Sequence, residues 1–171
     1  MRAARVSTTN AKQDKLFYVV TNATVYRSED GRCLILKRDE REVVHPGKWA
    51  NVGGKLEHAD LNMASPTSIA GDVVVFDDAL MQLLAREILE ESGVKVKPGP
   101  KFIGSKVFVR PDETPVVLLI FAVEYDSGEV KPEAGAFTEA AWVNAEEINN
   151  YDCIDGIKEE IETTIKMYEL A

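Results

Sequence analysis

The chain of 171 residues contains few cysteines and few histidines, and only 8% of it is aromatic. Its two cysteines, Cys33 and Cys153, are too few for a disulfide framework, so we expect free thiols and a reducing, cytoplasmic location. The two histidines, His45 and His58, have no partner at zinc-ligand spacing. These shortages disfavour both a disulfide-stapled secreted fold and a structural zinc site.

Long apolar runs are also missing. No stretch approaches the roughly 18 consecutive apolar residues that a membrane-spanning helix needs, and the N-terminal region lacks the apolar core of an export signal. We therefore expect no membrane partner. Residues 1–14 are polar and show no periodicity, which predicts a flexible arm followed by a single domain over residues 15–171.

Basic residues are outnumbered. The chain has 20 Lys and Arg against 29 Asp and Glu, a formal net charge of −9 and a pI near 4.8. A surface that follows nucleic-acid phosphates depends on Lys and Arg. The balance therefore argues against a nucleic-acid polymer as partner. A small anionic substrate would have to be bound locally, through a metal and a few basic groups.

What the chain does have is a cluster of carboxylates on one helix face. Glu87, Glu90 and Glu91 stand at offsets i, i+3 and i+4, so they fall within an arc of roughly 100° and we expect them to point the same way. Leu80, Leu83 and Leu84 project into the same arc, which predicts an inward-facing stripe. Clustered, partly desolvated carboxylates repel one another unless a cation neutralises them, and this favours a Mg²⁺ or Mn²⁺ site.

The residues around the cluster support this interpretation. Asp77 or Asp78 can cap the start of the helix, and Gly93 stands where a left-handed C-terminal cap belongs. Upstream, a strand runs into the Gly53-Gly54 turn, where backbone can approach a ligand closely.

At this point the chain resembles the Nudix hydrolases. Their signature runs Gly, five residues, Glu, seven residues, Arg-Glu, an aliphatic residue, any residue, Glu-Glu, any residue, Gly, aliphatic. Its second half is matched without a gap by Arg86, Glu87, Ile88, Glu90, Glu91, Gly93 and Val94. The segment Gly53-Gly54-Lys55-Leu56-Glu57 is similar to the usual lead-in, and the resemblance extends over residues 16–168.

The first half of the signature departs from the family. The position eight residues before Arg86 is Asp78 where the family has Glu, and residues 55–77 separate it from Gly54 where the family has five. We interpret this as an insertion at about residues 58–76, in the loop before the catalytic helix. Asp78 is then expected to hold Arg86 on a shorter arm, as the family Glu does, and the insertion is expected to affect substrate choice.

The resemblance also implies residue roles. Glu90 and Glu91 would be the principal metal ligands, Glu87 a further ligand or the base that orients water, and the Gly53 carbonyl an extra ligand. A later loop often adds a carboxylate in this family, and the candidates are Glu133 and Glu139. We favour Glu133 because it lies in a Pro/Gly segment. Candidate substrate contacts are Arg38, Gly54 and Lys55.

Alternation and periodicity predict the remaining elements. Two hairpins are expected, one from residues 16–27 and 32–37 and the other from 101–110 and 114–124. A further strand is expected at 137–143, and residues 71–76 could form a short extra strand or an apolar plug. Two more helices are expected, a short one at 145–149 and an amphipathic one at 154–170. With the helix at 78–92, this order predicts an α/β fold, and the resemblance implies a Nudix-type α/β/α sandwich with a mixed β-sheet.

Two classes of function remain open. One is a metal-dependent pyrophosphohydrolase, in which water attacks a nucleoside diphosphate linked to a group X. Its substrate would be a nucleoside triphosphate or a nucleotide sugar, with an isoprenoid diphosphate isomerase as a distant third reading. The other is a non-catalytic module that senses a nucleotide, for which the Asp78 substitution and the insertion are the only signals. A homodimer is neither favoured nor excluded by the sequence.

Overall fold

The computed structural model describes residues 3–170 and has two helices, α1 (Ala79–Ser92) and α2 (Ile157–Glu169). Short 3-10 turns occur at η1 (Gln13–Lys15), η2 (His58–Asp60) and η3 (Glu147–Asn150). Eight strands form the main sheet: β1 (Tyr18–Arg27), β2 (Arg32–Arg38), β3 (Trp49–Ala50), β4 (Val52–Lys55), β7 (Lys95–Val96), β8 (Lys101–Val109), β9 (Pro115–Ser127) and β10 (Phe137–Val143).

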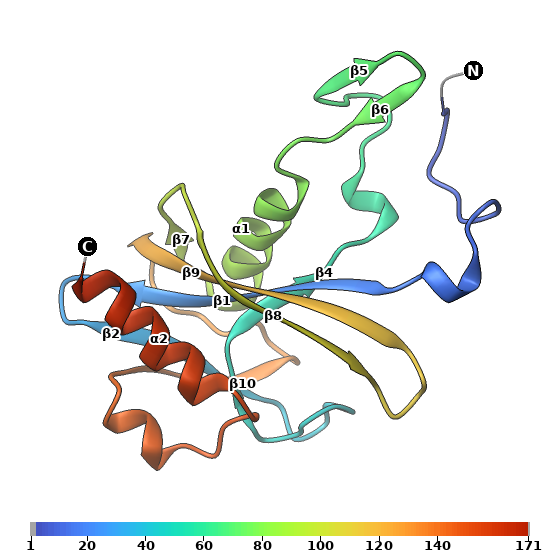
Figure 1. Ribbon diagram of the computed structural model, residues 1–171. Helices are drawn as coiled ribbons and strands as arrows, with labels where there is room; N and C mark the ends of the chain where they lie inside the picture. Colours follow the sequence, from blue (N-terminus) through green and yellow to red (C-terminus); the bar gives the residue numbers. More distant parts are fainter. Residues whose placement is uncertain (1–2, 171) are drawn as a thin grey trace.

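The main sheet is mixed. Its central path runs β10-β2-β1-β9-β7, with β3 on β2, β4 on β1 and β8 on β9. Strands β1 and β9 are parallel, and the other pairs are antiparallel. Figure 1 shows α1 and α2 on opposite faces of this sheet. The expected α/β/α sandwich is therefore confirmed. No helix in residues 3–170 is long and apolar enough to span a membrane.

Alternation along β1 divides the core into two halves. Ala23 and Val25 face α1 and pack in one cluster with Leu84 and Ile88. Tyr26 faces the other way, into the cluster that contains the apolar side of α2. Each helix therefore covers one face of the sheet with its own apolar stripe, and the sequence pattern predicted both stripes.

The face under α2 also holds a buried charge. Glu160 is 7% exposed, and its carboxylate accepts hydrogen bonds from Asn51 Nδ2 at 3.0 Å and Lys106 Nζ at 2.9 Å. Asn51 donates a second bond to Thr24 Oγ1 at 2.9 Å. A buried carboxylate is stable when donors surround it in this way. The network ties α2 to β1, to β8 and to Asn51 between β3 and β4.

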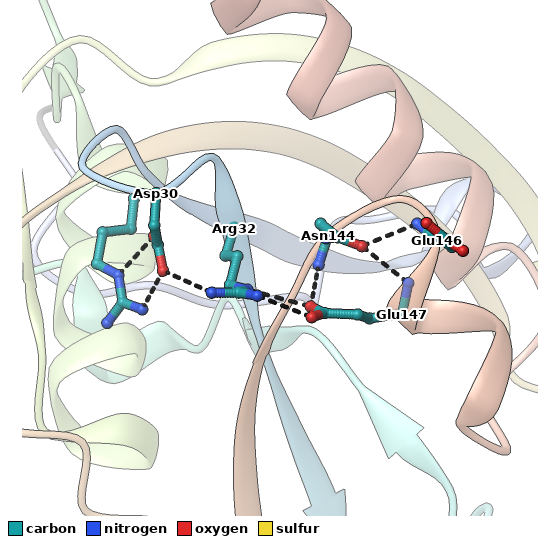
Figure 2. A network of polar contacts seen from close by, with 6 residues as sticks. Asp30, Arg32, Asn144, Glu146 and Glu147 are labelled. Carbon is teal, nitrogen blue, oxygen red and sulfur yellow. Dashed lines mark hydrogen bonds and ion pairs between the residues drawn. The ribbon is translucent and has the colours of Figure 1, made fainter.

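A second polar network holds the connection that leads from β10 to α2 (Figure 2). Arg32 donates to both carboxylate oxygens of Glu147, at 2.7 and 3.1 Å, and its Nη1 donates to Asp30 at 3.3 Å. The Asn144 side-chain oxygen accepts the backbone N–H groups of Glu146 and Glu147. The β1–β2 turn is thereby joined to η3, which replaces the short helix expected at 145–149.

The extra residues before α1 form a small hairpin. Strands β5 (Ser68–Ala70) and β6 (Val73–Val75) pair only with each other in the described chain, and Figure 1 shows them standing clear of the sheet beyond the first turn of α1. Val73 is 62% exposed. Of the two interpretations of residues 71–76, the short strand is therefore correct and the apolar plug is wrong.

Candidate active site

The three glutamates of α1 differ in burial. Glu91 lies deepest, the Glu87 side chain is 17% exposed and the Glu90 side chain is 53% exposed. Glu90 is the most exposed of the three, and Arg86, one helical turn earlier, donates to it at 2.9 Å. The predicted shared direction holds for Glu87 and Glu91, which both lie against the Gly53-Gly54 segment, whereas Glu90 is half exposed and pairs with Arg86.

Glu91 faces the backbone of β4. Its Oε2 accepts a hydrogen bond from the Gly53 N–H at 3.0 Å. Burial raises the pKa of Glu91 to about 8; the Gly53 bond opposes this shift, whereas the nearby charges of Glu87 and Glu133 add to it. A carboxylate that is desolvated among like charges is a poor structural group and a good cation ligand.

The Gly53-Gly54 segment lets the Glu87 and Glu91 carboxylates approach the backbone of β4 closely. A Cβ at Gly54 would lie 2.3 Å from the Glu87 carboxyl carbon, so only glycine leaves room for that side chain. Gly53 pairs with Asn22 of β1, yet its N–H bonds to Glu91 rather than to β1. Because the N–H and C=O of one strand residue point to the same edge, the Gly53 carbonyl is also directed toward α1.

Arg86 is held by a residue that the sequence analysis missed. Its Nη2 contacts Asp60 Oδ1 at 3.0 Å and Glu87 Oε1 at 2.9 Å. The prediction that Asp78 holds Arg86 is wrong. Asp78 is instead the residue before α1, with φ of 58° and no side-chain capping bond. Its backbone conformation, not its carboxylate, serves the helix start.

This contact relocates the insertion. Asp60 follows Gly54 after five residues, 55–59, which is the spacing of the family pattern. The residues that exceed the pattern therefore lie between Asp60 and Arg86, in the segment that carries β5 and β6. The five-residue spacing was the signal that could have identified Asp60, but Asp in place of Glu concealed it. Gly93 has φ of 76° at the end of α1, as predicted.

Of the two late carboxylates, Glu133 lies at the site. Its backbone N–H bonds to the Glu91 carbonyl at 2.9 Å, and its charge raises the pKa of both Glu87 and Glu91. Glu139 instead pairs with Lys37 at 2.8 Å on the exposed side of β10. The structure therefore brings Glu133, and not Glu139, to the carboxylates of α1.

The two candidate cations are placed differently. Arg38 is near enough for its charge to lower the pKa of Glu91, although its guanidinium donates to the Val44 carbonyl at 2.8 Å and also pairs with Glu42. Lys55 is exposed, and alternation along β4 directs it to the sheet face opposite Gly54. Arg38 is thus close to the carboxylates, and Lys55 is not brought to them.

The donor set fits a hard divalent cation, although no three Asp, Glu, His or Cys side chains within residues 3–170 already stand in a metal-holding arrangement. The observation that supports the fit is Glu91, a partly buried carboxylate whose pKa is raised by desolvation and, to a lesser extent, by its like-charged neighbours. Glu87, Glu91, Glu133 and the Gly53 carbonyl are the oxygen donors that Mg²⁺ or Mn²⁺ prefers. Glu90 would join them after leaving Arg86.

Comparison with known proteins gives a consistent result. The model of the NUDIX domain family matches residues 18–163. The NAD-capped RNA hydrolase NudC of Vibrio cholerae is 35% identical over 82 residues, which cover 48% of this chain and 29% of that protein. The phosphatase NudJ of Escherichia coli is 34% identical over 73 residues, covering 42% of this chain and 47% of that protein. Each match thus spans less than half of the relative.

Solved structures share the fold. A MutT protein from Methanosarcina mazei superposes with a TM-score of 0.64 at 23% identity, over 92% of this chain and 99% of that chain. The NUDIX domain of Shewanella oneidensis NrtR, complexed with ADP ribose, superposes with a TM-score of 0.66 at 13% identity, over 95% of both chains. At these identities the likeness concerns the fold alone.

Proposed function

The chain belongs to the NUDIX family, and from that premise we propose that it is a metal-dependent pyrophosphohydrolase. It would cleave a phosphoanhydride of a nucleoside diphosphate linked to a group X, with water as the attacking group. The observation that carries this proposal is the partly buried Glu91 carboxylate, which accepts a hydrogen bond from the Gly53 amide and lies near the charges of Glu87 and Glu133.

The chemistry requires a cation because the two phosphates of an anhydride repel an incoming hydroxide. When bound, Mg²⁺ or Mn²⁺ shields the phosphate oxygens and lowers the pKa of a water. The protein supplies the donors: Glu91 from the buried end of α1, Glu87 above Gly54, and Glu133 from the loop that bonds to the end of α1. Glu87 is also the candidate to orient the water, since Arg86 holds one of its oxygens.

Substrate class is narrowed by the charge of the chain. With a net charge of −9, the protein offers few cations to a polyanion, and Arg38 is the basic residue whose charge acts on Glu91. A small nucleotide held by the metal and one arginine fits this balance better than an RNA chain does. The relative NudC is an NAD-capped RNA hydrolase, so NAD belongs in the substrate panel beside the small nucleotides.

A panel of substrates tests the proposal. Nucleoside triphosphates, nucleotide sugars, ADP-ribose and NAD would each be incubated with the protein and Mg²⁺ or Mn²⁺, and the released phosphate, pyrophosphate and nucleoside monophosphate measured. We expect turnover of at least one nucleoside diphosphate derivative and its loss in excess chelator. The Glu91→Gln variant serves as the matched inactive control.

The opposite outcome would favour the alternative, a module that senses a nucleotide without cleaving it. Saturable binding with no turnover of any compound, with either cation, would establish that reading. The carboxylates argue against it, because a sensor gains nothing from a buried Glu91 whose pKa is raised to about 8.

A further inference from the structure

Thr21 is the one hydroxyl residue on the β1 face that α1 covers, and it is fully buried. Its neighbours on the same face, Ala23 and Val25, pack in the apolar cluster with α1. Alternation along the strand therefore directs the Thr21 side chain toward α1 as well. Thr21 Oγ1 has no hydrogen-bond partner in residues 3–170.

The unpaired hydroxyl lies beneath Glu87. Thr21 is the direct cross-strand partner of Gly54. Side chains at two such positions extend from the same face of the sheet, and their Cβ atoms are about 5 Å apart. The place of the missing Gly54 side chain is taken by Glu87, whose carboxyl carbon is 2.3 Å from the built Cβ position. The Glu87 side chain therefore lies over the strand position next to Thr21. Because Thr21 Oγ1 has no partner in residues 3–170, a bond to the carboxylate requires one bridging water or a small movement of Glu87.

We propose that Thr21 is a positioning residue for Glu87, whose hydroxyl donates a hydrogen bond to the Glu87 carboxylate, directly or through one water, when that carboxylate acts on the cation. The inference rests on the proposed function and deepens it. In the described structure Arg86 holds Glu87 Oε1 from the exposed side, and Thr21 offers a donor from the buried side. Two donors on opposite sides would fix the plane of the carboxylate.

A purely structural role does not explain the hydroxyl. Valine has the same shape, suits a strand at least as well and leaves no buried polar atom unpaired. A threonine at this position therefore lowers stability relative to valine unless its hydroxyl finds a partner. A buried hydroxyl without a partner calls for an explanation, and the nearby Glu87 carboxylate supplies one for Thr21.

The chain supplies a matched control. Thr164 of α2 is also fully buried, and its Oγ1 is likewise without a partner among the described residues. It belongs to the helix on the opposite face of the sheet from α1. Thr164→Val therefore removes an equivalent hydroxyl without touching the neighbourhood of Glu87.

The test compares Thr21→Val, Thr21→Ser and Thr164→Val in the full chain. We expect Thr21→Val to weaken Mn²⁺ binding, measured by calorimetry without substrate, by about 10- to 100-fold, the usual effect of removing a partner of a metal ligand. The value of kcat should fall by a similar factor while KM for the substrate changes little. Thr21→Ser, which keeps the hydroxyl, should restore both quantities to within about threefold.

Urea unfolding separates this role from a packing defect. Thr21→Val and Thr164→Val should both be at least as stable as the parent in the presence of chelator, because each loses an unpaired buried hydroxyl. Should Thr21→Val fail to fold, Thr21→Ala against Thr21→Ser isolates the hydroxyl in the same way. A folded Thr21→Val protein with parental Mn²⁺ affinity and kcat would overturn the inference.

The two proposals fail in different ways. If the parent protein hydrolyses no substrate, the proposed function is wrong, and the Mn²⁺ affinities still decide whether Thr21 supports Glu87. If the parent protein is active and the Thr21→Val variant behaves like it, the hydrolase assignment stands and Thr21 is only part of the core.

Discussion

Asp60 and Arg86 stand 26 positions apart in the sequence and form an ion pair of 3.0 Å between Oδ1 and Nη2. The pair joins the end of η2 to the helix that carries the glutamates. Arg86 simultaneously contacts Glu87 and Glu90, each at 2.9 Å. Asp60 therefore fixes the guanidinium that orients two of the three carboxylates.

This relationship predicts that Asp60→Asn lowers kcat by about 10- to 100-fold, because small displacements of reacting groups have effects of that size. Its effect on the free energy of unfolding should stay within about 1 kcal/mol, since the Arg86 side chain is 44% exposed. Steady-state kinetics and urea titration measure the two effects. Asp78→Asn, which changes an acid with no contact to Arg86, should leave kcat unchanged. If Asp78→Asn lowered kcat and Asp60→Asn did not, Asp78 and not Asp60 would be the residue that holds Arg86.

Glu91→Gln should abolish turnover, by about a thousandfold or more, while stabilising the protein in chelator at alkaline pH. The pKa of Glu91 is raised from 4.5 to about 8 in the folded state. The folded protein therefore binds more protons than the unfolded chain between these values, and its stability falls as pH rises through that window. Each pKa unit corresponds to about 1.4 kcal/mol, so the parent should lose up to about 5 kcal/mol that the variant keeps.

Urea unfolding at pH 5, 7 and 9 without divalent ions measures this difference. Glu139→Gln is the control, because Glu139 pairs with Lys37 away from the site and its removal should leave the pH slope unchanged. Parallel pH profiles for the parent and Glu91→Gln would show that Glu91 is not titrating in the folded state.

Glu133→Gln should lower turnover and Glu139→Gln should not. Glu133 is held at the end of α1 by its backbone bond to Glu91, and its charge acts on Glu87 and Glu91. If it is a cation ligand, its neutralisation should weaken Mn²⁺ binding and lower kcat by about 10- to 100-fold. Calorimetry with Mn²⁺ and rate measurements on both variants check this. Equal rates for the two would remove Glu133 from the site.

Local patterns predicted most of the fold. The strand Phe137–Val143 and the turn at 28–31 follow from alternation and turn residues. Helical spacing predicted the stripe of Leu80, Leu83 and Leu84, of which Leu83 and Leu84 are buried. These features depend on neighbours a few residues away. The sequence therefore identified the helix that bears the candidate site and two of its proposed ligands, Glu87 and Glu91.

Local sequence patterns could not predict contacts between segments that are far apart in the chain. Asp60 contacts Arg86, although the β5–β6 hairpin separates them in the sequence. The buried Glu160 carboxylate is bonded by Asn51, between β3 and β4, and by Lys106 of β8. A carboxylate in an amphipathic helix reads as a solvated residue until its donors are known. The orientation of Glu90 was missed for the same reason, since it depends on which partner Arg86 selects.

The β5–β6 hairpin is expected to act on substrate choice and not on the cation. Replacing residues 63–76 by a short Gly-Ser linker removes β5 and β6 but keeps Asp60, so the ion pair to Arg86 can still form. A two-stranded hairpin is marginally stable by itself, and its loss should have little effect on the free energy of unfolding. The relative kcat/KM values across the nucleotide panel should shift by about tenfold or more, while Mn²⁺ affinity should remain within about twofold.

A double variant that combines the same linker with Asp60→Asn separates the effect of the hairpin from the effect of the Asp60–Arg86 ion pair. If the hairpin acts only on substrate choice, the double variant should show the altered preference of the deletion and the reduced kcat of Asp60→Asn, with the two effects adding in free energy. If the deletion alone already lowers kcat as much as Asp60→Asn does, the hairpin instead positions Asp60 and belongs to the catalytic apparatus. Because both variants retain Glu87, Glu91 and Glu133, any difference between them reports on the segment between Asp60 and α1.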